Sequence, residues 1–255
     1  MPTLPQATRP PPPFPVTVLT GFLGAGKTTL LNKLLRDSVL ADTLVIINEF
    51  GEIGLDHLLV ESSNDETILM ASGCLCCTIR GDLVSTLEDL LRKRDNGRIT
   101  AFQRVIIETT GLADPAPVLH AIMYHPYLLM RFRLDGVVTL VDAVNGAHTL
   151  DAHQEAMKQA AVADRLVLTK TDLVTDARSL EALRARLTAL NPTARVLDAG
   201  RGEATAAALL DAGLFDLLRK SPDVGRWLND EAFALMDARG HRHDHDVNQI
   251  GRAHV

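Results

Sequence analysis

The feature that most constrains the fold is a glycine-rich segment near the N-terminus, Gly21-Phe22-Leu23-Gly24-Ala25-Gly26-Lys27-Thr28-Thr29. It follows an apolar run, Val16–Leu19, and precedes leucines at helical spacing. This is the G-x-x-x-x-G-K-[ST] pattern of a phosphate-binding loop in the strand-to-helix context that such a loop needs. The glycines let backbone N–H groups surround phosphate oxygens, and the start of the following helix also favours anions. Lys27 is predicted to reach the β- and γ-phosphates, and the Thr28 hydroxyl to ligate Mg²⁺.

The bulk properties of the chain are those of a globular α/β protein. Its 255 residues suit one large domain, or one domain with a tail. The net charge of −6 indicates neither nucleic acid nor an anionic membrane as a partner, and no apolar run reaches membrane-spanning length. Residues 1–15 are rich in proline and lack the apolar core of a secretion signal, so we expect a flexible arm.

An acidic loop follows the second predicted strand. The β-branched segment Thr43–Ile47 reads as that strand, and Asn48–Asp56 is the loop. In a phosphate-loop nucleotidase, this position suits a segment that responds to the γ-phosphate. Taken alone, Glu49 and Glu52 are more simply explained as residues of a solvated loop.

All three cysteines, Cys74, Cys76 and Cys77, lie within four residues. They are predicted at a junction between a short strand, Thr67–Met70, and a helix with leucines from Leu83 to Leu91, where the positive helix end favours thiolates. Such thiolates can converge on one Zn²⁺ at about 2.3 Å, with a fourth ligand from elsewhere or from water, and an open position suits a metal that is exchanged. Buried structural cysteines and a redox pair are the alternatives. A reduced, cytoplasmic compartment is expected in each case.

Two further segments bear polar residues at the ends of predicted strands. The apolar strand Arg104–Ile107 ends in Glu108, where a carboxylate would hold Mg²⁺ through water, and the Gly111 N–H would lie near the γ-phosphate. The strand Arg165–Leu168 delivers Thr169-Lys170-Thr171-Asp172. The Asp172 carboxylate can accept two hydrogen bonds from guanine that adenine cannot supply, and the Lys170 stem can lie over the base. Guanine is therefore the predicted base.

The remaining segments continue an alternation of strands and helices. We predict strands over Gly136–Val141 and Ala194–Leu197, and helices starting at Asp114-Pro115 and over Asp151–Ala163, Glu181–Leu190 and Asp211–Leu218. The alternation predicts an α/β fold with a mostly parallel sheet covered on both faces, and ligands at the carboxyl ends of its strands. His120 and His125 are each more simply packed or surface residues than metal ligands. After about Ser221 the pattern fades, and the tract His241–Asp246 is either a weak metal site or a solvated linker.

Six motifs occur in a characteristic order: the phosphate loop, N-E-F-G-E, G-C-L-C-C-T, E-T-T-G-L-A-D-P, L-V-D-A-V and T-K-T-D. Together they closely resemble the CobW-type metallochaperone GTPases of the P-loop SIMIBI class, over about Val16 to Leu218. The C-x-C-C box is the most specific mark. The resemblance implies a three-layer, Ras-like P-loop NTPase domain that hydrolyses GTP to GDP and phosphate. It also implies delivery of a transition metal, Zn²⁺ or else Co²⁺ or Ni²⁺, to a client metalloprotein or cofactor-synthesis enzyme.

Matching positions carry the family's site residues onto this chain. The resemblance assigns Gly21–Thr29 to the phosphates, with Lys27, Thr28 and Glu108 as catalytic residues. Thr28 and Glu108 would hold Mg²⁺, with Glu108 in place of the more usual Asp. Thr169, Lys170 and Asp172 would bind guanine, although Thr169 stands where many GTPases carry Asn. Cys74, Cys76 and Cys77 would hold the transferred metal, with Glu52 as an auxiliary ligand and His125 as a weaker candidate.

Family members usually carry a C-terminal domain after a His-rich linker, and this chain ends just after such a linker. We therefore expect a truncated fragment: an arm over 1–15, a GTPase domain with its metal site over 16–220, a linker over 221–249 and a non-native tail over 250–255. Ile250–Val255 is what read-through into a common sequencing adapter would encode.

Our hypothesis for the mechanism is that GTP·Mg²⁺ orders the Asn48–Asp56 loop against the cysteine site, so that hydrolysis alters metal affinity. Leu112, not a glutamine, follows Gly111, and no arginine finger is evident, so slow intrinsic hydrolysis is expected. Two other function classes fit the sequence. One is a P-loop small-molecule kinase with structural cysteines; the other is a zinc store or sensor with nucleotide as a regulatory ligand. No nucleic-acid or membrane partner is expected, and a homodimer is allowed.

Overall fold

The computed structural model describes residues 12–48, 67–69, 75–78, 83–210, 213, 215–216, 220–228 and 230. Several predicted features lie outside these ranges: Glu52, Cys74, the acidic loop from Glu49 on, and the His/Asp tract. No helix within the described ranges is long and apolar enough to cross a membrane.

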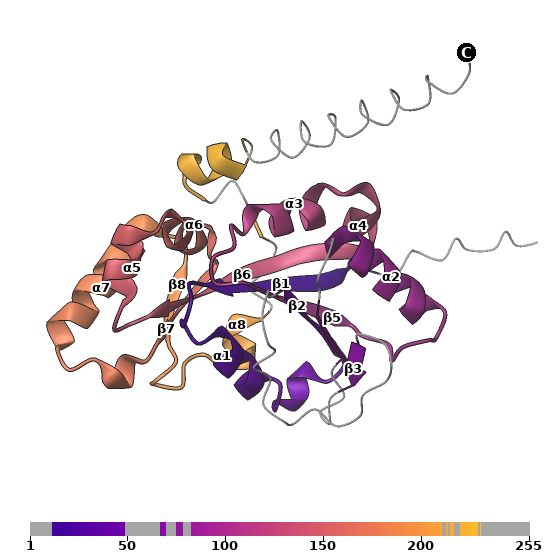
Figure 1. The fold of residues 1–255 in the computed structure, drawn as a ribbon, viewed down its shortest axis with the longest axis horizontal. Helices are drawn as coiled ribbons and strands as arrows, with labels where there is room; N and C mark the ends of the chain where they lie inside the picture. Colours follow the sequence, from indigo (N-terminus) through magenta and orange to yellow (C-terminus); the bar gives the residue numbers. More distant parts are fainter. Residues whose placement is uncertain are drawn as a thin grey trace, which may run out of the picture.

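Eight strands form one sheet in the order β3-β4-β2-β5-β1-β6-β7-β8 (Figure 1). The strands are β1 (Phe14–Gly21), β2 (Thr43–Asn48), β3 (Thr67–Leu69), β4 (Leu75–Thr78), β5 (Arg104–Thr109), β6 (Phe132–Asp142), β7 (Arg165–Thr169) and β8 (Arg195–Asp198). Every neighbouring pair is parallel except β3 and β4. The central strands are nearly continuous runs of buried residues, as parallel strands covered on both faces must be. The predicted α/β fold is confirmed.

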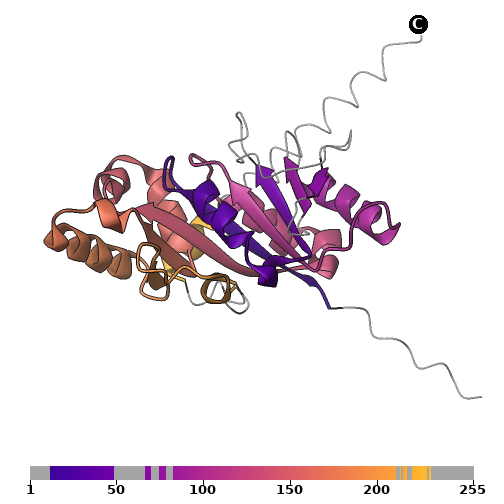
Figure 2. The same cartoon turned by 90° about the horizontal axis from the view of Figure 1, so that it is seen from below.

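Helices cover both faces of the sheet (Figures 1 and 2). They are α1 (Lys27–Leu34), α2 (Leu83–Asp95), α3 (Ala116–Tyr124), α4 (Pro126–Arg131), α5 (Gly146–Ala152), α6 (Gln154–Val162), α7 (Ala177–Leu190), α8 (Ala206–Leu209), and the short 3₁₀ helices η1 (Ser38–Leu40) and η2 (Thr171–Leu173). Because successive strand residues point to opposite faces, neighbours in β6 serve different clusters. Val137 packs with leucines of α2 and α3, whereas Val138 packs with leucines of α1. A third cluster lies beneath α5, α6 and α7.

The start of β1 differs from the expected boundary of the N-terminal arm. The strand begins at Phe14, two residues before the predicted run. The Phe14 ring lies 5.6 Å from that of Phe102 and 6.1 Å from that of Phe132, with the Arg94 guanidinium 4.4 Å from its centroid. These contacts make the last residues of the predicted arm part of the sheet.

The surroundings of the cysteines also differ from expectation. Cys76 and Cys77 lie within β4, and α2 begins only at Leu83, so these two residues are not at the strand-to-helix junction itself. The sequence analysis missed β4, which is four residues long. Pairing with β2 satisfies backbone groups that would otherwise be unpaired, which explains why so short a segment is a strand.

Two helix predictions require correction, and one helix was not predicted. The single helix Asp151–Ala163 is wrong, because His153 is extended (φ −133°, ψ 118°) and separates α5 from α6. This bend lets both helices pack against the third cluster. The helix Asp211–Leu218 is wrong for the described residues there, which are irregular, and Gly213 is left-handed (φ 94°). Instead, residues 222–228 are helical, beyond the point where the pattern was expected to fade.

Candidate nucleotide and metal site

The phosphate loop joins the end of β1 to the start of α1. Gly24 (φ 69°) and Gly26 (φ 88°) are left-handed, which favours glycine at both positions. A Cβ on Gly21 would lie 2.5 Å from the Leu140 carbonyl oxygen of β6. Gly26 is the residue that precedes α1, and no described side chain caps this helix. Its first N–H groups can therefore receive an anion, as the sequence predicts.

Lys27 is the buried cation of this loop. Its side chain runs to the base of the loop, where Nζ donates to the Gly21 carbonyl at 2.9 Å and lies 3.4 Å from that of Phe22. Lys27 is only 7% exposed. A buried ammonium at this position neutralises phosphate charge more effectively than one in water.

The two predicted Mg²⁺ ligands, Thr28 and Glu108, meet although 80 positions separate them. Glu108 is the next-to-last residue of β5, lies beside Leu19 of β1 and is 1% exposed. Thr28 Oγ1 donates to Glu108 Oε1 at 2.9 Å. With Thr28 Oγ1 as a direct ligand of Mg²⁺ at about 2.1 Å, the neighbouring Glu108 carboxylate can accept a hydrogen bond from a water ligand of the ion, as predicted. The pair therefore offers the oxygen atoms that a hard cation such as Mg²⁺ prefers.

The loop after β5 touches the phosphate loop directly. A Cβ on Gly111 would lie 2.6 Å from the Leu23 backbone nitrogen. Thr109 Oγ1 donates to Thr20 Oγ1 at 2.8 Å, which fastens β5 to β1 beneath the loop. The predicted position of Gly111 beside the phosphates is consistent with this close approach.

Two residues of α6 that the sequence analysis did not identify, Lys158 and Gln159, bind the loop that follows β5. Gln159 Nε2 donates to the carbonyls of Gly111 (3.2 Å) and Ala113 (3.0 Å). Lys158 Nζ donates to Asp114 Oδ2 at 2.6 Å. The other Asp114 carboxylate oxygen accepts from the Ala116 N–H at 2.9 Å, which confirms its predicted role at the start of α3. No sequence signal distinguishes Lys158 and Gln159 from other polar residues of a helix.

The predicted guanine residues lie at the carboxyl end of β7. Thr169 is 7% exposed, and its Oγ1 donates to the Ala25 carbonyl of the phosphate loop at 2.8 Å. This bond joins the predicted guanine-binding segment to the predicted phosphate loop, even though the residue is not Asn. Lys170 is left-handed (φ 57°), and Asp172 lies in η2 with an exposed side chain. An exposed carboxylate there can accept hydrogen bonds from a base.

Asp142, at the end of β6, orients Lys170 and is a third residue whose role the sequence analysis did not assign. Its carboxylate accepts from Lys170 Nζ at 2.7 Å, from the Val144 N–H at 2.8 Å and from Asn145. Burial by itself raises the pKa of Asp142, but the hydrogen bonds from Lys170, Val144 and Asn145 outweigh it, so the pKa lies below its usual value. Asp142 is therefore ionised at neutral pH.

Asp198, at the end of β8, organises the next loop in the same way. It is 1% exposed and accepts from Thr171 Oγ1 and Arg184 Nη2, both at 2.6 Å, and from the Gly200 N–H at 3.0 Å. Burial favours a higher pKa for Asp198, but the hydrogen bonds and the Arg184 charge lower it. The bond to Thr171 links this loop to the segment that carries Lys170 and Asp172.

The sheet order places β4, the strand that carries Cys76 and Cys77, two strands away from β5, which carries the predicted Mg²⁺ ligand Glu108. Ile46 of β2 pairs with Cys77 on one side and with Ile107, the residue before Glu108, on the other. Two strand spacings, about 10 Å, therefore separate the backbones of Cys77 and Ile107. Cys74 and Glu52 lie outside the described residues. Within the described ranges, no three His, Cys, Asp or Glu side chains are grouped as a metal site.

The two histidines of the third helix segment lie apart from this edge. His120 is 7% exposed on α3, with its ring edge-on to Tyr124 at 5.4 Å, so the packed interpretation is confirmed. His125 ends α3, with Nδ1 3.9 Å from Glu88 Oε1 of α2. α3 runs from the carboxyl end of β5 back toward the start of β6. His125 therefore lies toward the amino ends of the parallel strands, whereas Glu108 lies at their carboxyl ends. This placement disfavours His125 as a metal ligand.

Known proteins are similar to this chain in both sequence and fold. A curated zinc chaperone, YjiA of Escherichia coli, is 42% identical over 180 residues, which cover 71% of this chain and 56% of the relative. Zinc chaperone CobW of a Sinorhizobium species is 34% identical over 91% of this chain and 70% of its own. A zinc-regulated GTPase metalloprotein activator 1 of Schizosaccharomyces pombe is 35% identical over 74% of this chain and 46% of its own. This chain thus spans about half to two thirds of the length of these relatives.

The crystal structure of Zn(II)-bound YjiA GTPase from E. coli superposes with a TM-score of 0.67 at 39% identity, covering 80% of this chain and 63% of that one. The profile described as CobW/HypB/UreG, nucleotide-binding domain, matches residues 15–198. This range contains all the nucleotide residues described above, from Gly21 to Asp172. Since the profile matches well over half of the chain, the chain belongs to the CobW/HypB/UreG family.

Proposed function

We propose that this chain is the GTP-hydrolysing part of a metallochaperone that binds Zn²⁺ at Cys74, Cys76 and Cys77 and passes it to a client metalloprotein or cofactor-synthesis enzyme. The observation that carries the proposal is the sheet register, which sets β4 about two strand spacings from β5 on the edge that bears the Thr28–Glu108 pair. The relatives' names, zinc chaperone and zinc-regulated GTPase metalloprotein activator, support the same function. A clustered thiol site also needs a reducing compartment, so we place it in the cytoplasm.

The nucleotide half of the proposal assigns each residue a physical role. The loop amides of Gly24–Thr29 and the Lys27 ammonium hold the phosphates, and Thr28 with Glu108 holds the Mg²⁺ that neutralises charge on the transferred phosphoryl group. Lys170 and Asp172 select guanine, with Lys170 positioned by Asp142 at 2.7 Å. Glu52 is retained as an auxiliary metal ligand. Slow intrinsic hydrolysis is expected because no residue that would orient the attacking water is assigned.

The metal half requires that nucleotide state and metal affinity be coupled. The acidic loop from Glu49 on starts at the carboxyl end of β2, which lies between β4 and β5. A loop that leaves from between the two half-sites can contact both, so the γ-phosphate can change the metal site through it. A coupling of about 1–3 kcal/mol, or 5–150-fold in affinity, is the usual range for such linkage.

The test is a chelator-competition titration of Zn²⁺ with GDP and with a non-hydrolysable GTP analogue. We expect the two Zn²⁺ dissociation constants to differ by at least fivefold in the native protein. Cys76→Ser and Cys77→Ser should lose Zn²⁺ affinity yet keep GTP binding. Glu108→Gln should keep Zn²⁺ affinity with GDP but lose the nucleotide-dependent difference. Equal Zn²⁺ constants in both nucleotide states would reject the coupling.

The same preparation separates the two rival functions. Comparing GTP with ATP affinity tests the small-molecule kinase, which would prefer adenine and leave the cysteines structural. Hydrolysis that stays negligible with zinc and a client present would favour the zinc store or sensor. Tight Zn²⁺ binding together with at least tenfold preference for GTP supports the metallochaperone.

A further inference from the structure

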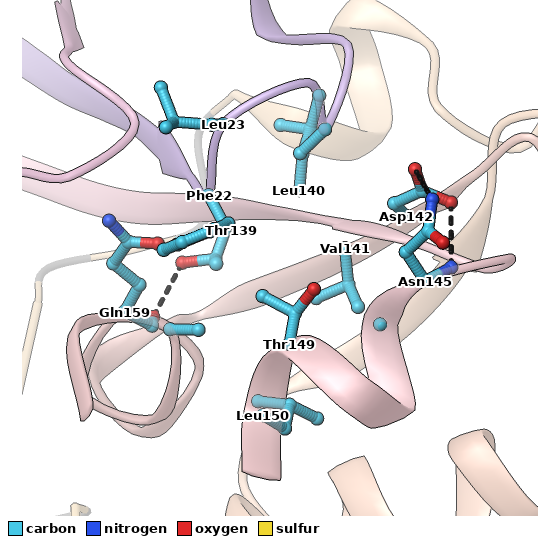
Figure 3. A pocket seen from close by; sticks show the side chains of 13 residues that line it. Phe22, Leu23, Thr139, Leu140, Val141, Asp142, Asn145, Thr149, Leu150 and Gln159 are labelled. Atoms are coloured by element: carbon cyan, nitrogen blue, oxygen red, sulfur yellow. Dashed lines mark hydrogen bonds between the residues drawn. The ribbon is translucent and has the colours of Figure 1, made fainter. Parts of the chain in front are cut away.

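A cavity of about 120 Å³ lies beside the phosphate loop and plays no part in the proposed function. Its walls come from the loop, from β6, and from α5 and α6, and include Phe22, Leu23, Val141, Leu150, Ala156 and Gln159 (Figure 3). The phosphates are assigned to backbone amides of the loop, whereas side chains of the loop line this cavity. The Phe22 ring is fixed by stacking on His153, with centroids 4.4 Å apart and an interplanar angle of 29°.

The cavity contains one buried acceptor without a hydrogen-bond partner. Gln159 is 1% exposed, and its Nε2 is committed to the Gly111 and Ala113 carbonyls. Its Oε1 is buried and accepts no hydrogen bond from any described residue. In Figure 3 this amide oxygen points to the side where Phe22 and Thr139 lie. A buried unpartnered carbonyl is unfavourable, so a donor placed in the cavity would be bound in preference to an apolar group of equal shape.

The lining excludes charged ligands. No Lys or Arg is among the lining residues, so neither a phosphate nor a second nucleotide finds a counter-charge. The one carboxylate of the lining, Asp142, is already paired with Lys170 at 2.7 Å and with two backbone amides. The ligand that fits is therefore neutral, with an apolar body against Phe22, Val141 and Leu150.

The volume limits the ligand to about one ring, since an apolar protein cavity of about 150 Å³ holds a benzene molecule. We propose that this cavity is a binding site for a neutral, ring-sized molecule with one hydrogen-bond donor, of which phenol is the simplest case. The donor bonds to Gln159 Oε1, and the ring fills the space against Phe22. Such a ligand would contact Phe22 and Leu23 of the phosphate loop, and also Gln159, the residue that holds the Gly111 loop.

The experiment titrates the full chain with phenol and with toluene, which has the same shape but no donor, by ligand-observed NMR. Native protein should bind both probes. Gln159→Met should weaken phenol roughly tenfold or more and leave toluene within about twofold, because only phenol loses a hydrogen-bond partner. Ala156→Leu fills the cavity and should abolish binding of both. Ala152→Leu, on an exposed position of α5 outside the lining, is the matched control and should change neither.

Saturating GTP·Mg²⁺ should leave the phenol affinity within about threefold, because the two ligands occupy different spaces. The proposal is overturned if native protein binds neither probe, if Gln159→Met weakens both equally, or if GTP displaces phenol. Thermal melts establish that each variant is folded. Should Ala156→Leu fail to fold, Ala156→Val and phenol-induced shifts of the Leu23 and Leu150 methyl resonances in native protein give the same decision. A failed metal titration would not affect these outcomes, so the two proposals fail separately.

Discussion

Two carboxylates, those of Asp142 and Asp198, hold the loops at the carboxyl ends of β6, β7 and β8 in place. Asp142 and Asp198 end β6 and β8, the two strands on either side of β7, and each binds both a cation and backbone N–H groups that follow it. Each therefore helps to fix the segment that carries the proposed guanine-binding residues Lys170 and Asp172. Because the ionised form receives these bonds, the pKa of each lies below its usual value although burial opposes this. Their contribution to stability consequently depends on pH.

Asp142→Asn is expected to lower the free energy of unfolding by about 1–2 kcal/mol at neutral pH, since the charge-assisted bond from Lys170 is lost. The pKa of Asp142 is lowered in the folded state from 3.8. Its stabilisation is thus fully present above that value and lost as the pH falls through the folded-state pKa. Urea unfolding at about pH 7, 5 and 3.5 should show a constant gap between native and variant protein at the first two and a smaller one at the last. The control is Asp151→Asn, whose ion pair with Arg186 is exposed; a gap that widened on acidification would contradict the prediction.

Gly111→Ala tests the contact between the two nucleotide loops. The new Cβ would lie 2.6 Å from the Leu23 backbone nitrogen, and backbone cannot move aside as a flexible side chain can. We expect GTP hydrolysis to fall roughly tenfold to hundredfold, because catalysis here depends on positioning. Gly225→Ala is the matched control: it lies in the helix 222–228 with open space around it and should raise stability by about 0.5–1 kcal/mol. Unchanged hydrolysis in Gly111→Ala would show that the loops separate in the active state.

At the scale of elements, α6 links the loop that follows β5 to the sheet. It anchors the loop after β5 through Gln159 and Lys158, and it packs against β6 and β7 through Ala156 and Ala160. The Lys158 ammonium also lies 4.9 Å from the Trp227 ring of the C-terminal helix. One side chain thus connects the loop that follows β5 to the last described helix.

Lys158→Met should loosen this loop without unfolding the protein. The ion pair with Asp114 is partly exposed, so its loss is worth no more than about 1 kcal/mol, which corresponds to amide exchange about two- to fivefold faster. Hydrogen exchange of peptides covering the loop from Thr110 to Asp114 measures it. Arg186→Met, which breaks an exposed ion pair on α7, should leave that exchange unchanged. Equal rates in the native protein and Lys158→Met would mean that Gln159 holds the loop alone.

Elements were predictable from the sequence where local pattern and tertiary demand agree. The buried strands and the loops at their ends follow from apolar runs closed by Gly, Thr, Glu or Asp, and this placed Thr28 beside Glu108 correctly. β4 was missed because so short a segment is a strand through its pairing with β2 and β3, which the local pattern does not show. The break at His153 was missed because α5 and α6 bury residues at spacings that one continuous helix would also give. Gln159 and Lys158 could not be found, since their roles depend on a loop more than 40 positions away.

For the whole molecule, the folded unit extends further than either the motifs or the family profile. The profile ends at residue 198, and the expected domain boundary was 220. Yet Lys220 donates from a buried position to the Ala163 carbonyl at 2.7 Å and to Asp164 at 2.6 Å. The helix over 222–228 buries Val224 and Leu228 in the hydrophobic cluster that also contains Val137 and leucines of α2 and α3. It lies on the outer side of this helix layer (Figure 1). Proline at its start and apolar residues four positions apart were a usable signal for this helix.

Leu228→Ala therefore tests where the domain ends. Leu228 is fully buried, so truncating it should cost about 2–4 kcal/mol of unfolding free energy, through lost transfer energy and the cavity left behind. Arg226→Ala, two positions earlier on the exposed side with an exposed ion pair to Asp223, should change stability by less than about 0.5 kcal/mol. Urea unfolding of both variants measures the difference. If Leu228→Ala were as mild as Arg226→Ala, the helix would be detached in solution, and the contact between Lys158 and the Trp227 ring would be lost there. If it is costly, the helix over 222–228 belongs to the folded core, and Lys158 links that helix to the Gly111 loop through its contacts with Trp227 and Asp114.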